Sequence, residues 1–184
     1  GHEAKGHLSP LAWTLLVIYF LQVGAEEAQP VLPPVESFEV SSGLLKKRGG
    51  TKTKPAPRAD DGACTTTAEL FRRFVRFYAT AFDWRNEAIC ARLGRRGAPD
   101  LTLPLHIIVK DDGSTAVGPS IENPFEDGSN LGDCMSASSL ARLHEELARA
   151  YELASKEDAS LTALLEPWAP PAEGEEKEED DKEN

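Results

Sequence analysis

The side chains that most often carry chemistry are thinly scattered in this sequence. The cysteines Cys64, Cys90 and Cys134 lie far apart and form no CxxC pair, which argues against a disulfide framework or a zinc site and fits a reducing compartment. D-x-D spacing is an economical way to aim two carboxylates at a pair of metal ions, and it occurs nowhere in the chain. His106 and His144 are expected to be ordinary surface or core residues. The sequence therefore predicts no catalytic residue and no metal site of its own.

The net charge of -11 is unevenly spread. Eight acidic residues and two lysines fall in 173–183, and we predict a disordered acidic tail over 167–184. A second polar stretch, 41–63, carries six basic residues within Lys46–Arg58 and is predicted to be a mobile insertion. We favour a solvated linker there. Contact with RNA phosphates, or a nuclear import signal at Lys46–Arg48, are the alternatives.

The first predicted element is a helix that starts at Ser9 and Pro10 and runs to about Val23, because serine and proline suit the first turn. It is apolar nearly all round, which predicts burial on several sides. Its apolar run, 11–21, is too short to span a bilayer, which takes about 20 residues, and it lacks a signal-peptide pattern. We therefore predict no membrane partner. Because the sequence lacks an initial methionine and enters this helix at once, we expect a fragment.

A second, amphipathic helix is predicted to follow a capping box formed by Thr66 and Glu69. Arg72, Arg73 and Arg76 occupy one face of it. The other face carries apolar, mostly aromatic residues at helical spacing: Leu70, Phe71, Phe74, Phe77, Tyr78 and Phe82. Such a stripe is more typical of a core-facing surface than of a ligand site, so we expect it to pack near the first helix.

The remaining segments predict a small β element and two more helices. Residues 88–93 and 103–109 are β-prone, and the turn signal at 111–113 follows the second run. A short helix is predicted at 161–165. A long helix before it carries large side chains on one side: Leu140, Leu143, Leu147 and Tyr151. Together these elements predict a mainly α domain with a small β element, an α+β fold, over 8–166.

Three strings, in this order, carry a family resemblance. They are LSPLAWTLLVIYFLQ followed by PVLP, then FVRFYATAFDWRNEAICARLG, then IENPFEDGSNLGDCMS. With them the chain resembles the poly(A)-polymerase-associated domain of terminal uridylyltransferases and related template-independent poly(A) RNA polymerases. The resemblance implies a largely helical C-terminal domain that forms one wall of a nucleotide cleft. The other wall would be a separate N-terminal catalytic domain, which would carry a Gly-Ser pair and the three catalytic carboxylates.

The resemblance also implies which residues face the nucleotide: Leu11, Asn123, Glu126, Ser129 and Asn130. Glu126 and Asn130 match the family pattern, whereas Asn123 stands where the family has aspartate. Ser129 replaces a histidine linked to uracil preference, and Leu11 replaces a tyrosine that stacks on the base. Loss of that stack should weaken nucleotide binding tenfold or more, since stacking contributes on the order of 1–3 kcal/mol. Glu126 as a helix cap and Asn130 as a turn residue are the purely structural alternatives.

Basic residues mark a predicted RNA path. Arg92, Arg95 and Arg96 form a small cationic cluster after the FDW string, and we expect any RNA to run between this cluster and the basic stretch at 46–58. The Asp-Trp pair at 83–84 is expected to end a helix and to pack as a core aromatic.

The leading hypothesis is the C-terminal nucleotide-binding part of a template-independent RNA nucleotidyltransferase that adds UMP or AMP to RNA 3′ ends, not catalytic alone. Its partners would be UTP or ATP and an RNA 3′ end, with Mg²⁺ or Mn²⁺ bound only together with the missing catalytic domain. The alternatives are a non-catalytic RNA- or protein-binding module derived from such an enzyme, and a small helical interaction domain without nucleotide ancestry. The expected location is the cytoplasm, with the nucleus second.

Overall fold

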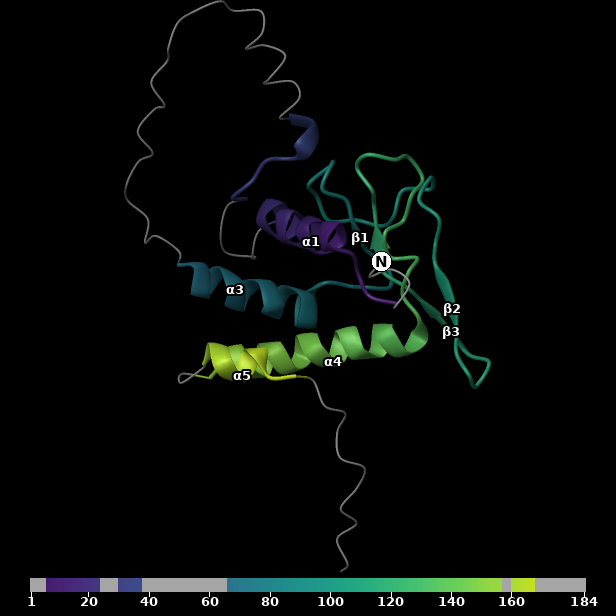
Figure 1. Cartoon of the computed structure of the whole chain (residues 1–184). Coiled ribbons are helices and arrows are strands. Elements are labelled where there is room, and N and C mark those ends of the chain that lie inside the picture. The colour runs from purple at the N-terminus through teal and green to yellow at the C-terminus, as the bar shows by residue number, and fades with distance from the viewer. Residues whose placement is uncertain (1–5, 24–29, 38–65, 157–159, 168–184) are drawn as a thin grey trace, which may run out of the picture.

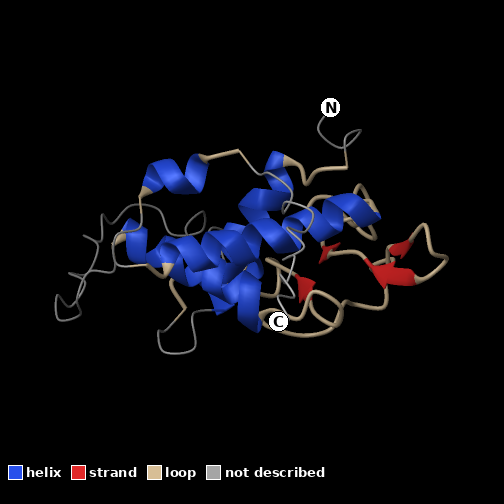
Figure 2. Ribbon diagram, turned by 90° about the horizontal axis from the view of Figure 1, so that it is seen from below, coloured by secondary structure: helices blue, strands red, loops and turns tan. Residues whose placement is uncertain are grey.

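The computed structural model describes residues 6–23, 30–37, 66–156 and 160–167 (Figure 1). The predicted insertion at 41–63 lies outside these residues, as does the predicted acidic tail apart from its first residue. The described part is mainly helical, and its strands gather at one end of the helices (Figure 2). The predicted mainly α architecture with a small β element is confirmed.

Helix α1 (Pro10–Val23) has the bounds that the sequence predicts. The Oγ of Ser9 accepts a hydrogen bond from the amide of Ala12 at 3.2 Å, which caps the first turn. The side that carries Leu16 and Tyr19 is fully buried. The opposite side leaves three large apolar side chains 37–45% exposed: Leu11, Trp13 and Val17. The prediction of burial on several sides is wrong for this face, because no described segment covers it.

The second helix changes its winding at its end. Helix α3 (Thr67–Arg76) starts at the predicted cap, Thr66, and continues directly into η2 (Phe77–Ala81), a π-helical turn. The amide of Phe82 donates to the carbonyl of Phe77, five residues back, at 2.9 Å. This wider turn brings the rings of Phe77 and Phe82 together, with centroids 5.8 Å apart and ring planes tilted by 45°. The sequence predicted the helix but not the π turn.

The aromatic stripe packs against α1, as predicted. The ring of Phe20 lies 5.7 Å from that of Phe74, and the hydroxyl of Tyr78 donates to the carbonyl of Leu16 at 2.8 Å. Phe71 departs from the prediction, since it is 42% exposed. We call the resulting cluster the aromatic joint: Tyr19, Phe20, Phe74, Phe77, Tyr78, Phe82 and Trp84.

The C-terminal helices close the other side of α3. Helix α4 (Ala137–Ala154) lies beside α3 (Figure 1). Of the predicted inward-facing residues, Tyr151 is only half-buried, and three are buried: Leu140, Leu143 and Leu147. Helix α5 (Leu161–Leu165) has its predicted bounds. Arg149 of α4 fixes it by donating to the carbonyl of Ala163 at 2.9 Å.

The two outer strands form a hairpin. Strand β2 (Ile107–Val109) pairs antiparallel with β3 (Thr115–Val117). The predicted turn signal lies between them, and Gly113 adopts a φ of 78°, a conformation that favours glycine. The strand covers only the end of the predicted run 103–109, because Leu103 closes a turn on the carbonyl of Asp100.

The two inner strands are shorter than the sequence predicts. Strand β1 (Ala88–Ile89) pairs in parallel with β4 (Ser120–Ile121). The predicted run 88–93 leaves the ladder after two residues, since the carbonyl of Ala91 accepts the amide of Val35 instead, at 3.2 Å. The proline-rich segment after α1 therefore docks beside β1 and limits the sheet.

Candidate functional site

A compact loop follows β4. The amide of Asn123 donates to the carbonyl of Ser129 at 3.0 Å, and the amide of Ser129 donates to the carbonyl of Glu126 at 3.2 Å. The amide of Glu126 in turn donates to the carbonyl of Asn123 at 3.3 Å. These turns lie one inside another, so we call residues 122–130 the nested loop. Its base brings the Nδ2 of Asn123 to 3.4 Å from the Oγ of Ser129.

Asn130 holds the nested loop from beneath. It is buried, and its Oδ1 accepts from the amides of Ile121 and Gly132, each at 2.9 Å. Its Nδ2 donates to the carbonyl of Pro104 at 3.1 Å. The carboxamide thus makes three hydrogen bonds within the protein. This is the turn-residue role that the sequence left open for Asn130.

The tip of the nested loop faces solvent. Phe125 is 82% exposed, and Glu126 and Asp127 are exposed beside it. Helix capping by Glu126 is wrong, because the next helix, α4, has Ser136 as its N-cap. The carboxylate of Glu126 is therefore available to a ligand. Sequence reasoning did not single out Phe125, although a lone aromatic between a proline and an acid is an unusual tip for a loop.

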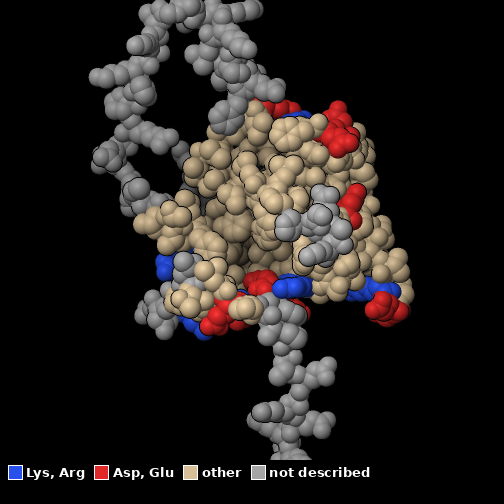
Figure 3. Space-filling view, in the orientation of Figure 1, with Lys and Arg blue, Asp and Glu red and all other residues tan. Residues whose placement is uncertain are grey.

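The fifth predicted nucleotide-facing residue lies on another element. Leu11 occupies the first turn of α1 and is 37% exposed. It belongs to the uncovered apolar face that also carries Trp13 and Val17. In Figure 3 the charged side chains gather at the rim of the molecule, and the area around α1 is largely uncharged. The structure thus groups four of the five residues in one loop and places Leu11 on the helix.

Two of the three predicted RNA-contacting arginines form ion pairs within the chain. Arg92 forms ion pairs with Glu36 at 2.5 Å and with Glu122 at 3.1 Å, and these carboxylates raise the pKa of its guanidinium. Arg96 pairs with Glu87 at 2.6 Å and lies over the ring of Phe77, 5.5 Å from its centroid. The three arginines therefore do not form one open cationic cluster.

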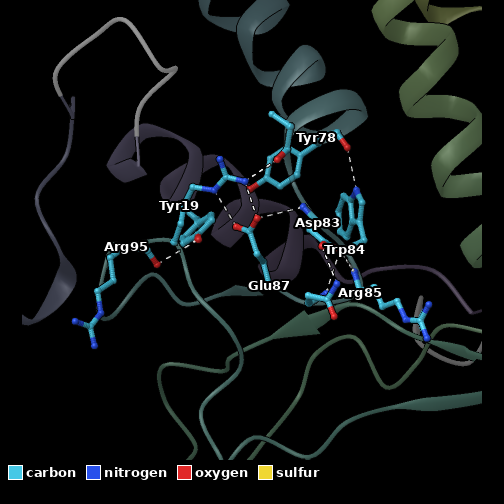
Figure 4. Close-up of polar contacts among 10 residues, drawn as sticks. Tyr19, Tyr78, Asp83, Trp84, Arg85, Glu87 and Arg95 are labelled. Carbon is cyan, nitrogen blue, oxygen red and sulfur yellow. Dashed lines mark hydrogen bonds and ion pairs between the residues drawn. The ribbon is translucent and has the colours of Figure 1, made fainter.

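Arg95 differs from its neighbours. Its carbonyl accepts a hydrogen bond from the hydroxyl of Tyr19 at 3.3 Å, which anchors the backbone to α1. Its guanidinium makes no ion pair with any described residue, and it points away from the polar network around Glu87 (Figure 4). Arg95 is thus the one of the three arginines whose guanidinium has no carboxylate partner among the described residues.

The Asp-Trp pair is structural, as predicted. Asp83 lies directly after Phe82, the C-cap of the π turn. Its carboxylate accepts from the side chain of Asn86 at 2.8 Å and from the amides of Arg85 and Asn86 (Figure 4). The hydrogen bond from the Asn86 side chain is the main reason why the pKa of Asp83 is lowered. The indole of Trp84 donates to the carbonyl of Tyr78 at 2.9 Å.

A cavity of about 350 Å³ lies against the nested loop. Residues 95–103 form part of its wall, and Glu122, Gly128 and Cys90 complete it. Burial and the hydrogen bond to Glu122 raise the pKa of the Cys90 thiol to about 11, so the thiol is protonated and a poor nucleophile at neutral pH. We call this space the loop cavity. A second cavity, of about 360 Å³, lies among α1, α3 and α4.

Among the residues that the structure describes, no group of three His, Cys, Asp or Glu side chains is arranged to hold a metal ion. Within the same residues no helix is both long enough and apolar enough to cross a membrane.

The structure is similar to solved terminal uridylyl transferases. It matches a cytoplasmic RNA terminal U-transferase with a TM-score of 0.56 and 22% identity, over 92% of this chain and 54% of that chain. It matches the RNA terminal uridylyl transferase Cid1 with a TM-score of 0.57 and 20% identity, over 92% and 52%. RNA editing TUTase 1 from Trypanosoma brucei, solved with a UTP analogue, gives a TM-score of 0.50 and 20% identity, over 83% and 32%.

These matches confirm the predicted resemblance at the level of the fold. The chain has the fold of part of the terminal uridylyl transferases, and it spans about half the length of the first two. No protein-family model matches the sequence, and no curated protein is significantly similar to it.

Proposed function

We propose that this chain is the C-terminal, nucleotide-binding part of a template-independent RNA nucleotidyltransferase that adds UMP or AMP to RNA 3′ ends. The observation that carries the proposal is the likeness in fold over 92% of the chain to two terminal uridylyl transferases. The nested loop, which lies in the third of the strings that carry the family resemblance, supports it. The domain would extend over 8–166, and the cytoplasmic or nuclear location stays a prediction.

The nested loop offers the hydrogen-bonding groups that a base edge needs. The carboxylate of Glu126 only accepts, so it suits the N3–H of uracil or the amino group of adenine. Asn123 and Ser129 both donate and accept, and they sit together at the base of the loop. In this proposal Asn130 does not touch the nucleotide but positions the residues that do.

Ser129 and Leu11 should make the site weaker and less selective. A serine hydroxyl rotates to donate or accept, so it discriminates poorly between uracil and adenine. Leu11 gives an apolar contact in place of an aromatic stack, which contributes on the order of 1–3 kcal/mol. We therefore assign nucleoside triphosphates as a class, without preference for one base.

In the proposal, the metal ions that catalyse the reaction are held by another domain. Nucleotidyl transfer uses two divalent ions that activate the RNA 3′ hydroxyl and stabilise the leaving pyrophosphate. The described residues offer no such site, so Mg²⁺ or Mn²⁺ would be held by carboxylates of a separate catalytic domain. The role of this chain is to bind the base and to form one wall of the cleft.

Primer extension tests the proposal. The isolated chain, given Mg²⁺ or Mn²⁺, any ribonucleoside triphosphate and an RNA primer, should extend nothing. Joined to an upstream catalytic domain with a Gly-Ser pair and D-x-D, it should extend the primer. In the joined protein Asn123→Ala should lower kcat/KM about tenfold, while the exposed hairpin variant Asp111→Ala should not. Extension by the isolated chain would overturn the metal argument.

The departures at Leu11 and Ser129 support one other candidate, a non-catalytic RNA- or protein-binding module derived from such an enzyme. A folded, full-length protein that has the catalytic acids and yet binds no nucleotide would favour this module. An upstream sequence without Gly-Ser and D-x-D would favour it too.

A further inference from the structure

We propose that the loop cavity binds the 3′-terminal nucleotide of the RNA to be extended. This inference rests on the proposed function and adds to it a second subsite, distinct from the face of the nested loop that would meet the incoming nucleotide. It assigns a role to Arg95 and to the segment 95–103, which the nucleotide site does not use.

The loop cavity lies beside the proposed nucleotide site. Glu122 and Gly128 line the loop cavity, and each is followed directly by a proposed base-contacting residue, Asn123 and Ser129. The nested loop is therefore a wall shared by the cavity and the proposed nucleotide site. In nucleotidyl transfer the RNA 3′ hydroxyl attacks the α-phosphate of the incoming nucleotide, so the two nucleotides must be neighbours. A pocket that shares this wall satisfies that requirement.

The loop cavity has the size and the lining of a site for one nucleoside. The volume of about 350 Å³ lies at the lower end of the range for small-molecule sites, roughly 300–1,000 Å³, and suits one nucleoside. Leu93, Ala98 and Leu103 give apolar walls for the face of a base. Thr102 and Cys90 add polar atoms beside them. An apolar pocket with a few polar groups is typical of a site for a flat, hydrogen-bonding ring.

The loop cavity carries charged side chains of both signs. Arg95 lines the cavity without an ion pair among the described residues, so it can bind a phosphate. Asp100 brings an exposed carboxylate to the same cavity, where it can accept hydrogen bonds from the N–H groups of a base, whereas the oxygens of Glu122 already accept from Cys90 and Arg92. This balance disfavours a bare anion such as inorganic phosphate. It fits a nucleotide, which carries a phosphate at one end and N–H donors at the other.

RNA binding by cavity-filling variants tests the inference. The probes are a hairpin RNA with a six-nucleotide 3′ overhang, the same hairpin with a blunt end, and free AMP and UMP, titrated into the full 184-residue chain. Ala98 is exposed at the cavity wall, so Ala98→Trp should fill the cavity without unfolding the protein. The matched control is Ala141→Trp, on the exposed side of α4.

The expected result is that the chain prefers the overhang to the blunt hairpin, and that Ala98→Trp weakens binding of the overhang about tenfold, the effect of losing one stacked base. Ala141→Trp should bind as the unaltered chain does. Arg95→Ala should weaken binding about fivefold and reduce its dependence on salt, because one phosphate contact is lost. Arg85→Ala is its control, since Arg85 is also exposed but points to the other side of the network (Figure 4).

Three results would overturn the inference. The first is that the Ala98→Trp and Ala141→Trp variants bind the overhang equally well. The second is that the chain does not prefer the overhang to the blunt hairpin. The third is that AMP or UMP binds as tightly as the overhang, which would mark a pocket for free nucleotides. Binding of UTP and ATP by the same variants separates this failure from failure of the proposed function. If Ala98→Trp leaves both triphosphate and RNA binding unchanged, only the cavity assignment fails.

Discussion

The aromatic joint and the nested loop are both held by side chains that bond to backbone, but they leave different groups free. In the joint, Tyr78 and Trp84 turn their polar atoms inward onto carbonyls, and all the rings are buried except those of Phe74 and Trp84, which are half-buried. In the loop, the buried carboxamide of Asn130 bonds to the backbone, whereas Phe125 and Glu126 at the tip are exposed to solvent. The string that carries FYATAFDW thus builds a frame, whereas the string that carries IENPF presents groups to a ligand.

The largest expected effect concerns the base of the nested loop. A Cβ at Gly132 would lie 1.9 Å from the carbonyl oxygen of Pro119, which is backbone and cannot move aside cheaply. Gly132→Ala should therefore lower the free energy of unfolding by about 3 kcal/mol or more. At Gly97 a Cβ meets nothing within 4 Å, so Gly97→Ala is the control and should change little. Urea unfolding measures both, and equal stability of the two variants would contradict the role of Asn130 and its neighbours as a tight base.

The second effect concerns the affinity of the proposed nucleotide site. Leu11→Tyr restores an aromatic ring at the first turn of α1 and should tighten UTP and ATP binding about tenfold, since one stacked base contributes on the order of 1–3 kcal/mol. Val17→Tyr places the same ring further along the exposed face of α1 and should have no such effect. Calorimetric titration distinguishes them. The same gain from both substitutions would mean that tyrosine acts nonspecifically.

A smaller effect concerns a hydrogen bond of the aromatic joint. Tyr78→Phe removes the hydrogen bond to the carbonyl of Leu16 from a buried position and should cost about 1 kcal/mol in unfolding free energy. Tyr151, half-buried on α4, is the matched control, and Tyr151→Phe should be nearly neutral. If Tyr78→Phe is neutral as well, the joint is held by ring packing alone.

The smallest effect is a pH dependence of stability that comes from Cys90, whose thiol donates to Glu122 of the nested loop. Burial raises the pKa of the Cys90 thiol from 9.0 to about 11, so the folded state favours the protonated thiol. As the pH rises, the unfolded chain loses this proton first. The contribution is therefore complete below pH 9 and is lost progressively from pH 9 to about 11.

Cys90→Ser removes this titration and should flatten the fall in stability over that range. Buried tyrosines, whose pKa values are also raised, would account for what remains above pH 10. An unchanged pH dependence in Cys90→Ser would assign the whole fall to the tyrosines.

The helices were predictable because their signals are local. Ser9 and Thr66 cap the first turns of their own helices, and the period of the apolar residues marks the inner face. The strands were not, because their ends depend on distant partners. Nothing in the run 88–93 tells that the carbonyl of Ala91 will accept from Val35, which lies on the proline-rich segment.

The candidate site was predictable only as a set of positions. The resemblance located the nested loop, but the hydrogen bonds that bury Asn130 come from Ile121, Gly132 and Pro104 and become evident only in three dimensions. The ion pairs of the predicted cationic cluster were hidden for a similar reason. Arg92 and Arg95 look equivalent in the sequence, but carboxylates from two other segments pair with Arg92, whereas no carboxylate in the described part of the chain pairs with Arg95.

The most direct test of the central claim is to map where a nucleotide contacts the chain. Amide chemical shifts of the 184-residue chain should be followed while UTP and, separately, ATP are titrated in. The account predicts that shifts concentrate in residues 123–129 and the first turn of α1, with similar affinity for the two nucleotides. Shifts confined to the second cavity among α1, α3 and α4, or no shifts at all, would contradict the assignment of the nested loop as the nucleotide-binding element.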